Sequence, residues 1–135
     1  MLLKYSKKYQ IMIIPENIEK DEKTINVRVK DNRIELKVEQ IIYCEADGDY
    51  TKIFMFKRKK PYFASGCLLK TGQLIDSAEF QRISHKHLVN LQYYVHLNTF
   101  ENKRDLHLEE GIVLQVSDRK LPVLRNKLKQ LGLKK

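Results

Sequence analysis

The feature that most constrains the fold is an alternation of apolar and polar residues between positions 24 and 38. The apolar positions in this stretch are Ile25, Val27, Val29, Ile34, Leu36 and Val38. A period of two puts all of them on one face of an extended chain. Asp31 and Asn32 lie between the two runs and have side chains that turns favour. The sequence therefore predicts a β-hairpin over residues 24–38.

The same kind of pattern recurs along most of the chain. Short apolar segments bounded by turn-forming residues predict further strands at 41–46, 50–56, 88–91, 94–99, 105–108 and 112–116. Gly48 and Gly111 mark two of the tight turns between them. Strands joined by tight turns pair antiparallel. The expected fold class is therefore mostly β, with several antiparallel sheets and two short helices.

The two helices are expected at residues 68–75 and from about residue 120 onward. Gly72 weakens the first helix, because glycine has a low helix propensity. In the second, leucines recur on one face at positions 121, 124, 128 and 131. Ser117 is the predicted cap of this helix, and Pro122 fits only in its first turn.

The length of 135 residues fits one domain with its own hydrophobic core. We expect this domain at residues 23–135 and an N-terminal arm or extra strand at residues 1–22. No apolar run approaches the ~20 residues that cross a bilayer, and no secretory leader pattern is present. Cys44 and Cys67 have neither metal-site spacing nor the density of a disulfide scaffold. We therefore expect a cytoplasmic protein with free thiols, no cofactor and no membrane partner.

A net charge of +9 predicts a polyanionic partner, with nucleic acid ahead of an anionic membrane. The cations concentrate at residues 52–60 and 119–135. The sequence contains no helix-turn-helix pair, zinc finger or basic zipper pattern. If the chain binds DNA, loops and turns must present the donors to the base edges.

One stretch, residues 80–91, combines apolar anchors with a polar centre. Phe80 and Ile83 precede the polar residues, and a short apolar strand at 88–91 follows them. The centre, residues 84–87, carries hydroxyl, imidazole and ammonium groups that can be held toward a partner. A solvated connection between two strands is the plainer interpretation of the same residues. Nothing pairs these histidines with a nucleophile or metal ligands, so no catalytic or metal site is predicted.

Three segments, at residues 41–51, 80–90 and 108–119, together resemble the LytTR family of bacterial DNA-binding domains. The middle segment is the most specific of the three, and the resemblance covers roughly residues 24–131. It implies an elongated sandwich of antiparallel sheets. It also implies a transcriptional regulator whose loops enter successive major grooves on one face of double-stranded DNA.

By position, the resemblance assigns DNA contacts to three loops of this chain. The residues are Thr51 and Lys52 in the first, Ser84, His85 and Lys86 in the second, and Arg119 and Lys120 in the third. Arg82 lies just before the second loop, where we expect it to brace the loop rather than contact DNA. The family usually has His, a polar residue and then Ser where this chain has residues 84–86.

Many relatives carry a phosphorylatable receiver domain ahead of the DNA-binding part. Only about two dozen residues precede the matching region here, so we expect a stand-alone domain controlled by its abundance or by a regulatory protein partner. The resemblance also implies that two copies bind direct repeats as a homodimer on DNA.

Three alternatives compete with a sequence-specific DNA-binding regulator. One is an RNA-binding β domain that stacks bases on Tyr50, Phe54 and Phe56, although Phe54 and Phe56 also suit a core. Another is a module whose basic patches bind an acidic or phosphorylated protein. An enzyme built on His85 and His87 is the weakest of the three, because no partner group is evident.

Overall fold

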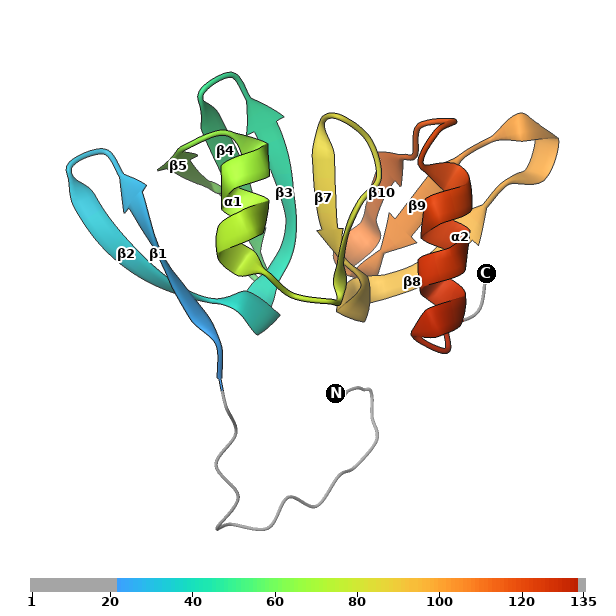
Figure 1. The fold of residues 1–135 in the computed structure, drawn as a ribbon, viewed down its shortest axis with the longest axis horizontal. Coiled ribbons are helices and arrows are strands. Elements are labelled where there is room, and N and C mark those ends of the chain that lie inside the picture. Colours follow the sequence, from blue (N-terminus) through green and yellow to red (C-terminus); the bar gives the residue numbers. More distant parts are fainter. Residues whose placement is uncertain (1–21, 134–135) are drawn as a thin grey trace, which may run out of the picture.

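Three antiparallel sheets lie side by side along the long axis of the molecule (Figure 1). The structure is a computed structural model that describes residues 22–133. The predicted arm or extra strand at residues 1–22 falls almost entirely outside the described residues. The strands are β1 (Thr24–Val29), β2 (Asn32–Lys37), β3 (Ile41–Asp47), β4 (Tyr50–Met55), β5 (Tyr62–Ser65), β6 (Phe80–Arg82), β7 (His87–Asn90), β8 (Tyr94–Asn98), β9 (Asp105–Leu108) and β10 (Ile112–Gln115).

The sheets have the orders β1-β2, β5-β4-β3-β7-β6 and β10-β9-β8. Every pairing in them is antiparallel. Two helices, α1 (Leu68–Ile75) and α2 (Leu121–Gln130), lie on the same side of the molecule. The predicted fold class is confirmed: a mostly β chain of several antiparallel sheets with two short helices.

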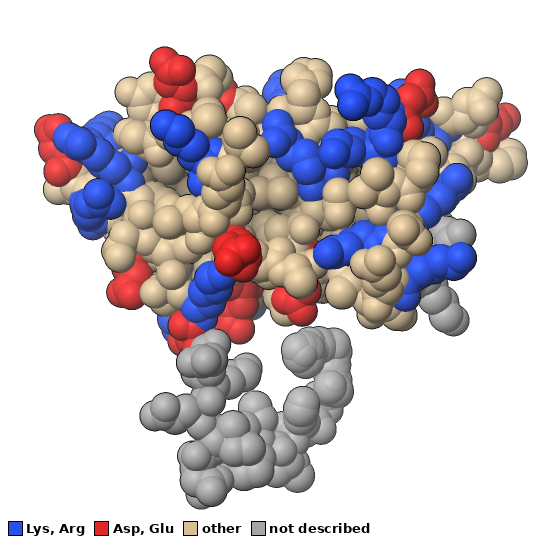
Figure 2. Space-filling view, viewed as in Figure 1, with Lys and Arg blue, Asp and Glu red and all other residues tan. Residues whose placement is uncertain are grey.

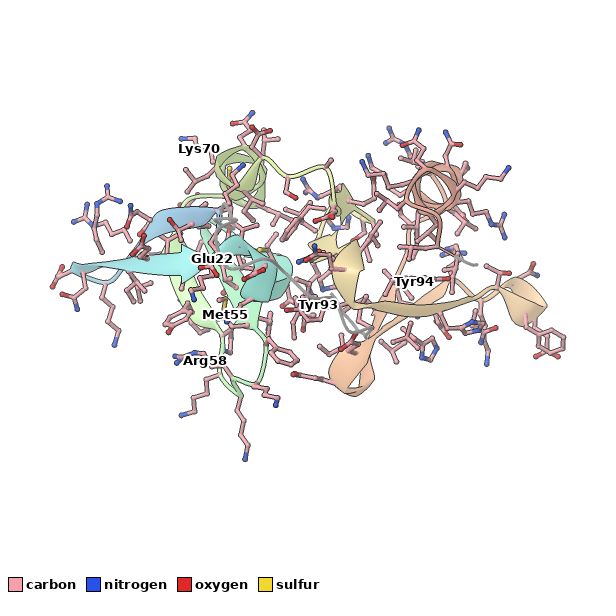
Figure 3. The ribbon with its side chains drawn as sticks, turned by 90° about the horizontal axis from the view of Figure 1, so that it is seen from below. Glu22, Met55, Arg58, Lys70, Tyr93 and Tyr94 are labelled. Carbon is pink, nitrogen blue, oxygen red and sulfur yellow. The ribbon has the colours of Figure 1, made fainter. Side chains whose placement is uncertain are left out.

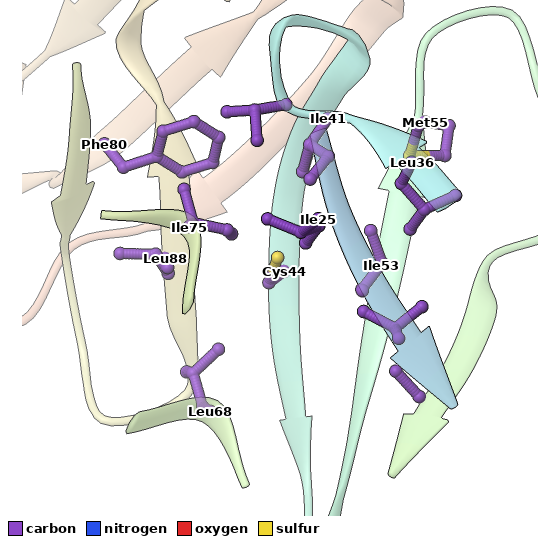
Figure 4. Packing of buried hydrophobic residues seen from close by; sticks show 13 residues of the cluster. Ile25, Leu36, Ile41, Cys44, Ile53, Met55, Leu68, Ile75, Phe80 and Leu88 are labelled. Atoms are coloured by element: carbon purple, nitrogen blue, oxygen red, sulfur yellow. The ribbon is translucent and has the colours of Figure 1, made fainter. Parts of the chain in front are cut away.

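The hairpin at the N-terminal side forms as the alternation predicts. Ile25 pairs with Leu36 and Val27 with Ile34, and these side chains face inward while their neighbours are exposed. Lys30, with a φ of 56°, turns the chain between the two strands. The hairpin, α1 and one face of the five-stranded sheet enclose a first core, which contains Ile41, Ile53 and the buried thiol Cys44 (Figure 4).

A second core lies between the five-stranded sheet, the three-stranded sheet and α2. Val89, Leu106 and Val116 are fully buried there, and Leu124 and Leu128 of α2 pack against them. The leucine pattern that predicted this helix thus marks its buried face. Each sheet is apolar on the side that meets a core, which is why the three stack into one elongated unit.

The first helix spans the predicted residues, and the structure gives Gly72 a packing reason. A Cβ at this position would lie 3.3 Å from a methyl carbon of Leu88, so glycine lets α1 approach β7 closely. The predicted Ser117 cap lies one turn ahead of the regular second helix. The helix begins at Leu121 with Lys120 at its N-cap and no side-chain cap there. Ser117 instead closes the preceding turn, where its hydroxyl accepts a hydrogen bond from the Lys120 amide at 3.3 Å.

Candidate nucleic-acid interface

Three connections meet along one edge of the molecule, uppermost in Figure 1. They are the β3–β4 turn (48–49), the β6–β7 loop (83–86) and the segment before α2 (117–120), and we call this the recognition edge. The Ala46 amide donates to the Lys86 carbonyl at 2.8 Å, and the Ser117 amide donates to the Ile83 carbonyl at 2.9 Å. Backbone hydrogen bonds therefore join the β6–β7 loop to the end of β3 on one side and to the segment before α2 on the other.

The β6–β7 loop is a tight, internally bonded turn. The Ser84 hydroxyl accepts hydrogen bonds from the amides of Lys86 and His87, both at 3.1 Å. The Ile83 amide donates to the His87 carbonyl at 3.1 Å and closes the loop. His85 and Lys86 are exposed, whereas Ser84 is half-buried. The loop thus presents an imidazole and an ammonium group to solvent, while the serine shapes the backbone.

Arg82 braces this loop, as the sequence predicted. Its Nε donates to the Ser84 carbonyl at 2.8 Å, and its Nη2 donates to the His85 carbonyl at 2.7 Å. A guanidinium holds two acceptors at once because its donors form a rigid fork. The side chain therefore fixes the backbone on either side of the exposed imidazole.

The segment before α2 has a brace of the same kind. The Nε of Arg104 donates to the Val116 carbonyl at 2.7 Å, and its Nη1 lies 3.1 Å from an Asp118 carboxylate oxygen. Arg119, the next residue, is exposed, and Lys120 is half-buried. No local pattern in the sequence points to Arg104, because the two positions that the fold brings together here, 104 and 116, are far apart in the chain.

The second and third predicted loops share one shallow hollow of about 310 Å³. Its lining residues are Arg82, Ser84, His85, Ser117, Arg119 and Lys120. Four of these six are predicted contacts; Arg82 and Ser117 were not. Lysine and arginine side chains also gather over this part of the molecule, near the ends of β7 and α2 (Figure 2). The hollow concentrates hydrogen-bond donors and positive charge in one place.

The first predicted contact pair, Thr51 and Lys52, does not line this hollow. Thr51 and Lys52 are in strand β4, not in a loop. Thr51 is fully buried; its hydroxyl donates to the Gly66 carbonyl at 2.9 Å and accepts from the Thr71 hydroxyl at 3.1 Å. The prediction that Thr51 contacts DNA is therefore wrong for this conformation. Alternation along β4 turns its side chain into the first core.

The Lys52 side chain faces the opposite side of the sheet, where neighbouring side chains partly engage its ammonium group. Its Nζ lies 3.6 Å from a Glu45 carboxylate oxygen and 5.6 Å from the centre of the Phe63 ring. Glu45 pairs with Lys52 on one side and with His87 on the other. Two strand spacings, about 10 Å, therefore separate Lys52 from β7 and the hollow beyond it.

Glu45 is the centre of a small charged network beneath the edge. His87 Nε2 donates to its carboxylate at 2.9 Å. Burial raises the pKa of Glu45, but the hydrogen bond and charge of His87, with the charges of Lys86 and Lys52, outweigh it. The pKa of this carboxyl therefore lies below its ordinary value of 4.5. An ionised Glu45 ties β3, β4 and β7 together where the edge begins.

The aromatic residues of β4 do not form the continuous platform that the RNA-binding alternative invoked. Phe54 stacks on Tyr43, with ring centres 4.3 Å apart, and packs against the second core. Phe56 lies beyond the end of β4. Tyr50 remains exposed at 51% of its surface.

Within residues 22–133, no group of three or more histidine, cysteine, aspartate or glutamate side chains is arranged to hold a metal ion. No helix in this part of the chain has the length and apolar character needed to cross a membrane.

Comparison with known proteins bears on the fold and the family of the chain. Residues 31–129 match the family model of the LytTr DNA-binding domain. The fold is similar to the solved LytTr DNA-binding domain of a methyl-accepting/DNA response regulator from Bacillus cereus. The TM-score is 0.66 at 17% identity, over 78% of this chain and 95% of that one. No curated protein matches the chain. Since the family match spans most of its length, the chain belongs to the LytTR family of DNA-binding domains.

Proposed function

We propose that this chain is a sequence-specific, double-stranded DNA-binding transcriptional regulator that reads major grooves through its loops. The observation that carries the proposal is the shared hollow, where two loops fixed by backbone hydrogen bonds expose His85 and Arg119 beside Lys120. Hydrogen-bond donors held on fixed loops at an exposed, basic edge suit base edges and phosphates. Binding then costs little conformational entropy, because the loops are already ordered.

Each exposed side chain has a role that its chemistry supports. Arg119 can donate two hydrogen bonds to guanine O6 and N7, a contact worth ~1–3 kcal/mol of discrimination. His85 donates to a base acceptor or a phosphate. Lys86 and Lys120 act as point charges toward phosphate, with Lys52 at the margin of the site. The main role of the half-buried Ser84 hydroxyl is to hydrogen-bond the loop backbone, and contact with DNA is secondary.

The proposal extends to how the protein works in the cell. Two copies bind paired direct repeats as a homodimer on DNA, and a regulatory protein or a change in abundance controls them. The site is not catalytic and needs no cofactor. Such a regulator acts where the bacterial chromosome is, in the cytoplasm.

Selection from a pool of random duplex DNA at near-physiological salt tests this proposal. Wild type should enrich a defined motif, and Arg119→Ala should relax or abolish it. The matched control is Arg33→Ala, which removes an exposed arginine from the β1–β2 hairpin. The proposal fails if wild type enriches no motif, or if both variants weaken binding equally, because net charge alone would then explain the binding.

Single-stranded nucleic acid is a second candidate ligand, supported by two exposed aromatic side chains. Tyr50 is 51% and Phe63 is 47% exposed, on the neighbouring strands β4 and β5. The Lys52 ammonium lies 5.6 Å from the Phe63 ring centre. Exposed rings beside a cation suit stacked bases. Displacement of bound duplex by an equal concentration of single strands would favour this candidate, and failure to displace it would exclude it.

A further inference from the structure

A second basic surface lies outside the recognition edge. The β4–β5 connection carries Lys57, Arg58, Lys59 and Lys60 in sequence, all of them exposed, and we call these four residues the basic loop. No ion pair within the described part of the chain involves any of them. Four adjacent positive side chains therefore face solvent, and their charges add over a short length of chain.

The basic loop is at the opposite end of the sheet from the recognition edge. The Phe56 amide donates to the Gln40 carbonyl at 2.8 Å, and the Phe56 ring centre lies 5.7 Å from that of Tyr93. These contacts place the loop beside the start of β3, whereas the recognition edge lies beside its end. The six residues of β4, about 20 Å of extended strand, separate the β3–β4 turn from the basic loop. A duplex lying on the recognition edge does not reach the loop unless it bends around the sheet.

The loop has a defined shape. The Arg58 amide donates to the Met55 carbonyl at 3.2 Å, and the Arg58 Nε donates to the Lys60 carbonyl at 2.8 Å. The Lys57 amide donates to the Glu110 carboxylate at 3.0 Å, which ties the loop to the hairpin between β9 and β10. Seen from below, Arg58 projects on the side away from the two helices (Figure 3). The charges are thus held outward on a fixed backbone.

The surface offers charge rather than an apolar contact. The aromatic rings nearest to the loop are covered by the loop's own cations. The Arg58 guanidinium lies 3.9 Å from the Tyr62 ring centre, and the Lys57 ammonium lies 5.3 Å from that of Phe56. A specific protein interface usually has a buried apolar centre with anchor residues. A phosphate backbone needs only a dense row of cations.

We propose that the basic loop binds the phosphate backbone of a second DNA segment while the recognition edge holds the first. The inference relies on the proposed function only for the first segment. The loop contributes no base readout, because it presents side-chain charge from outside the region that faces the recognised duplex. The protein then bridges two stretches of DNA.

A two-duplex capture experiment tests the proposal. An immobilised duplex that carries only the selected site is saturated with protein, and recruitment of a second, labelled duplex without the site is measured. The test variant changes Lys57, Lys59 and Lys60 together with Arg58 to glutamine. The control variant makes the same change of charge at exposed positions outside the basic loop, namely Lys30, Arg33, Lys70 and Lys129.

Wild type and the control variant should recruit the second duplex, and the basic-loop variant should lose at least five-fold of this recruitment. Its affinity for the immobilised site should stay within two-fold of wild type. The slope of log K against log salt for the second duplex should fall by about 0.9 for each phosphate contact removed. Equal losses in both variants, or no loss in the basic-loop variant, would overturn the proposal.

Two further experiments are needed. One tests phosphate binding by the basic loop even if the recognition edge has no specific site, and the other tests whether the loop binds a protein instead of DNA. If no specific site exists, both variants are titrated with random duplex alone, and a larger loss for the basic-loop variant still supports the phosphate-binding loop. An acidic peptide replaces the second duplex in the other arm. Loss of peptide binding with retained duplex recruitment would identify a protein-binding loop and contradict the proposal.

Discussion

The brace formed by Arg82 gives a prediction whose size can be worked from the structure. Arg82 makes two hydrogen bonds, of 2.8 and 2.7 Å, to the carbonyls of Ser84 and His85, one on either side of the His85 side chain. Hydrogen bonds to a charged group contribute ~1.5–3 kcal/mol each when they are well shielded. Because the guanidinium is half-exposed and water can replace it, we expect a loss of about 1–2 kcal/mol on replacement by an apolar side chain.

Most of that loss should appear in DNA binding rather than in global unfolding. The Ser84 hydrogen bonds still close the loop, so the fold persists, but they open more often, and DNA must now restore the geometry around His85. A deficit of about 1.4 kcal/mol corresponds to a ten-fold change in affinity. We therefore predict that Arg82→Met weakens binding to the selected duplex by about ten-fold.

Arg82→Lys separates the contribution of the two guanidinium hydrogen bonds from that of the positive charge. Lysine keeps the positive charge in the hollow but cannot hold two carbonyls as a planar fork. We expect Arg82→Lys to lose about three- to ten-fold in affinity, and the amides of Lys86 and His87 to exchange hydrogen faster in both variants. The assays are duplex titration and amide exchange, with Arg33→Met as the charge-matched control. Wild-type affinity for Arg82→Lys, with unchanged exchange, would refute the reasoning.

Further predictions concern the core, the buried threonine, the acid limb and the thiols. Leu124→Ala should lower the free energy of unfolding in urea by about 2–5 kcal/mol, because the fully buried side chain leaves a cavity; a loss below about 1 kcal/mol would contradict the second core. Thr51→Val should destabilise the fold by about 1–3 kcal/mol, because the partner groups lose their hydrogen bonds, but leave DNA affinity unchanged; a selective loss of affinity would restore Thr51 as a contact. Because the pKa of Glu45 is lowered in the folded state, its ionised carboxylate contributes stability that is present above pH 4.5 and is lost as the pH falls through the folded-state pKa. Glu45→Gln should therefore reduce the fall in the free energy of unfolding at acid pH. An unchanged fall would exclude Glu45 as its cause. Burial raises the pKa of the Cys44 thiol to about 12, so a thiol reagent should modify Cys67 first and reach Cys44 only on unfolding; two fast thiols in the native state would be inconsistent with the first core.

The elements were predictable from sequence because their signals are local. The period-two pattern identified the hairpin at 24–38, and the leucines of α2 identified its buried face. Ser117 makes a capping hydrogen bond, but three residues ahead of the helical N-cap, in the turn that leads into α2. Local patterns do not specify where such a turn ends.

The candidate site was only partly predictable, because its geometry depends on contacts between distant residues. The family resemblance assigned His85 and Arg119 to the candidate site, and both side chains line one hollow. Position alone could not show that Thr51 faces inward, because the register of β4 against β3 and β5 decides this. Arg104 was missed for the same reason, since its partner carbonyl belongs to Val116.

Methylation interference at guanine N7, on the duplex that wild type selects, tests the central claim most directly. N7 lies in the major groove, so methylation there blocks a bidentate arginine contact. For wild type, we predict clusters of guanines on one face of the duplex, about 10 base pairs apart, at which methylation weakens binding. For Arg119→Ala, methylation of one of these guanines should no longer affect binding. Binding that is indifferent to N7 methylation, with the same pattern for wild type and Arg119→Ala, would contradict reading of the major groove by these loops.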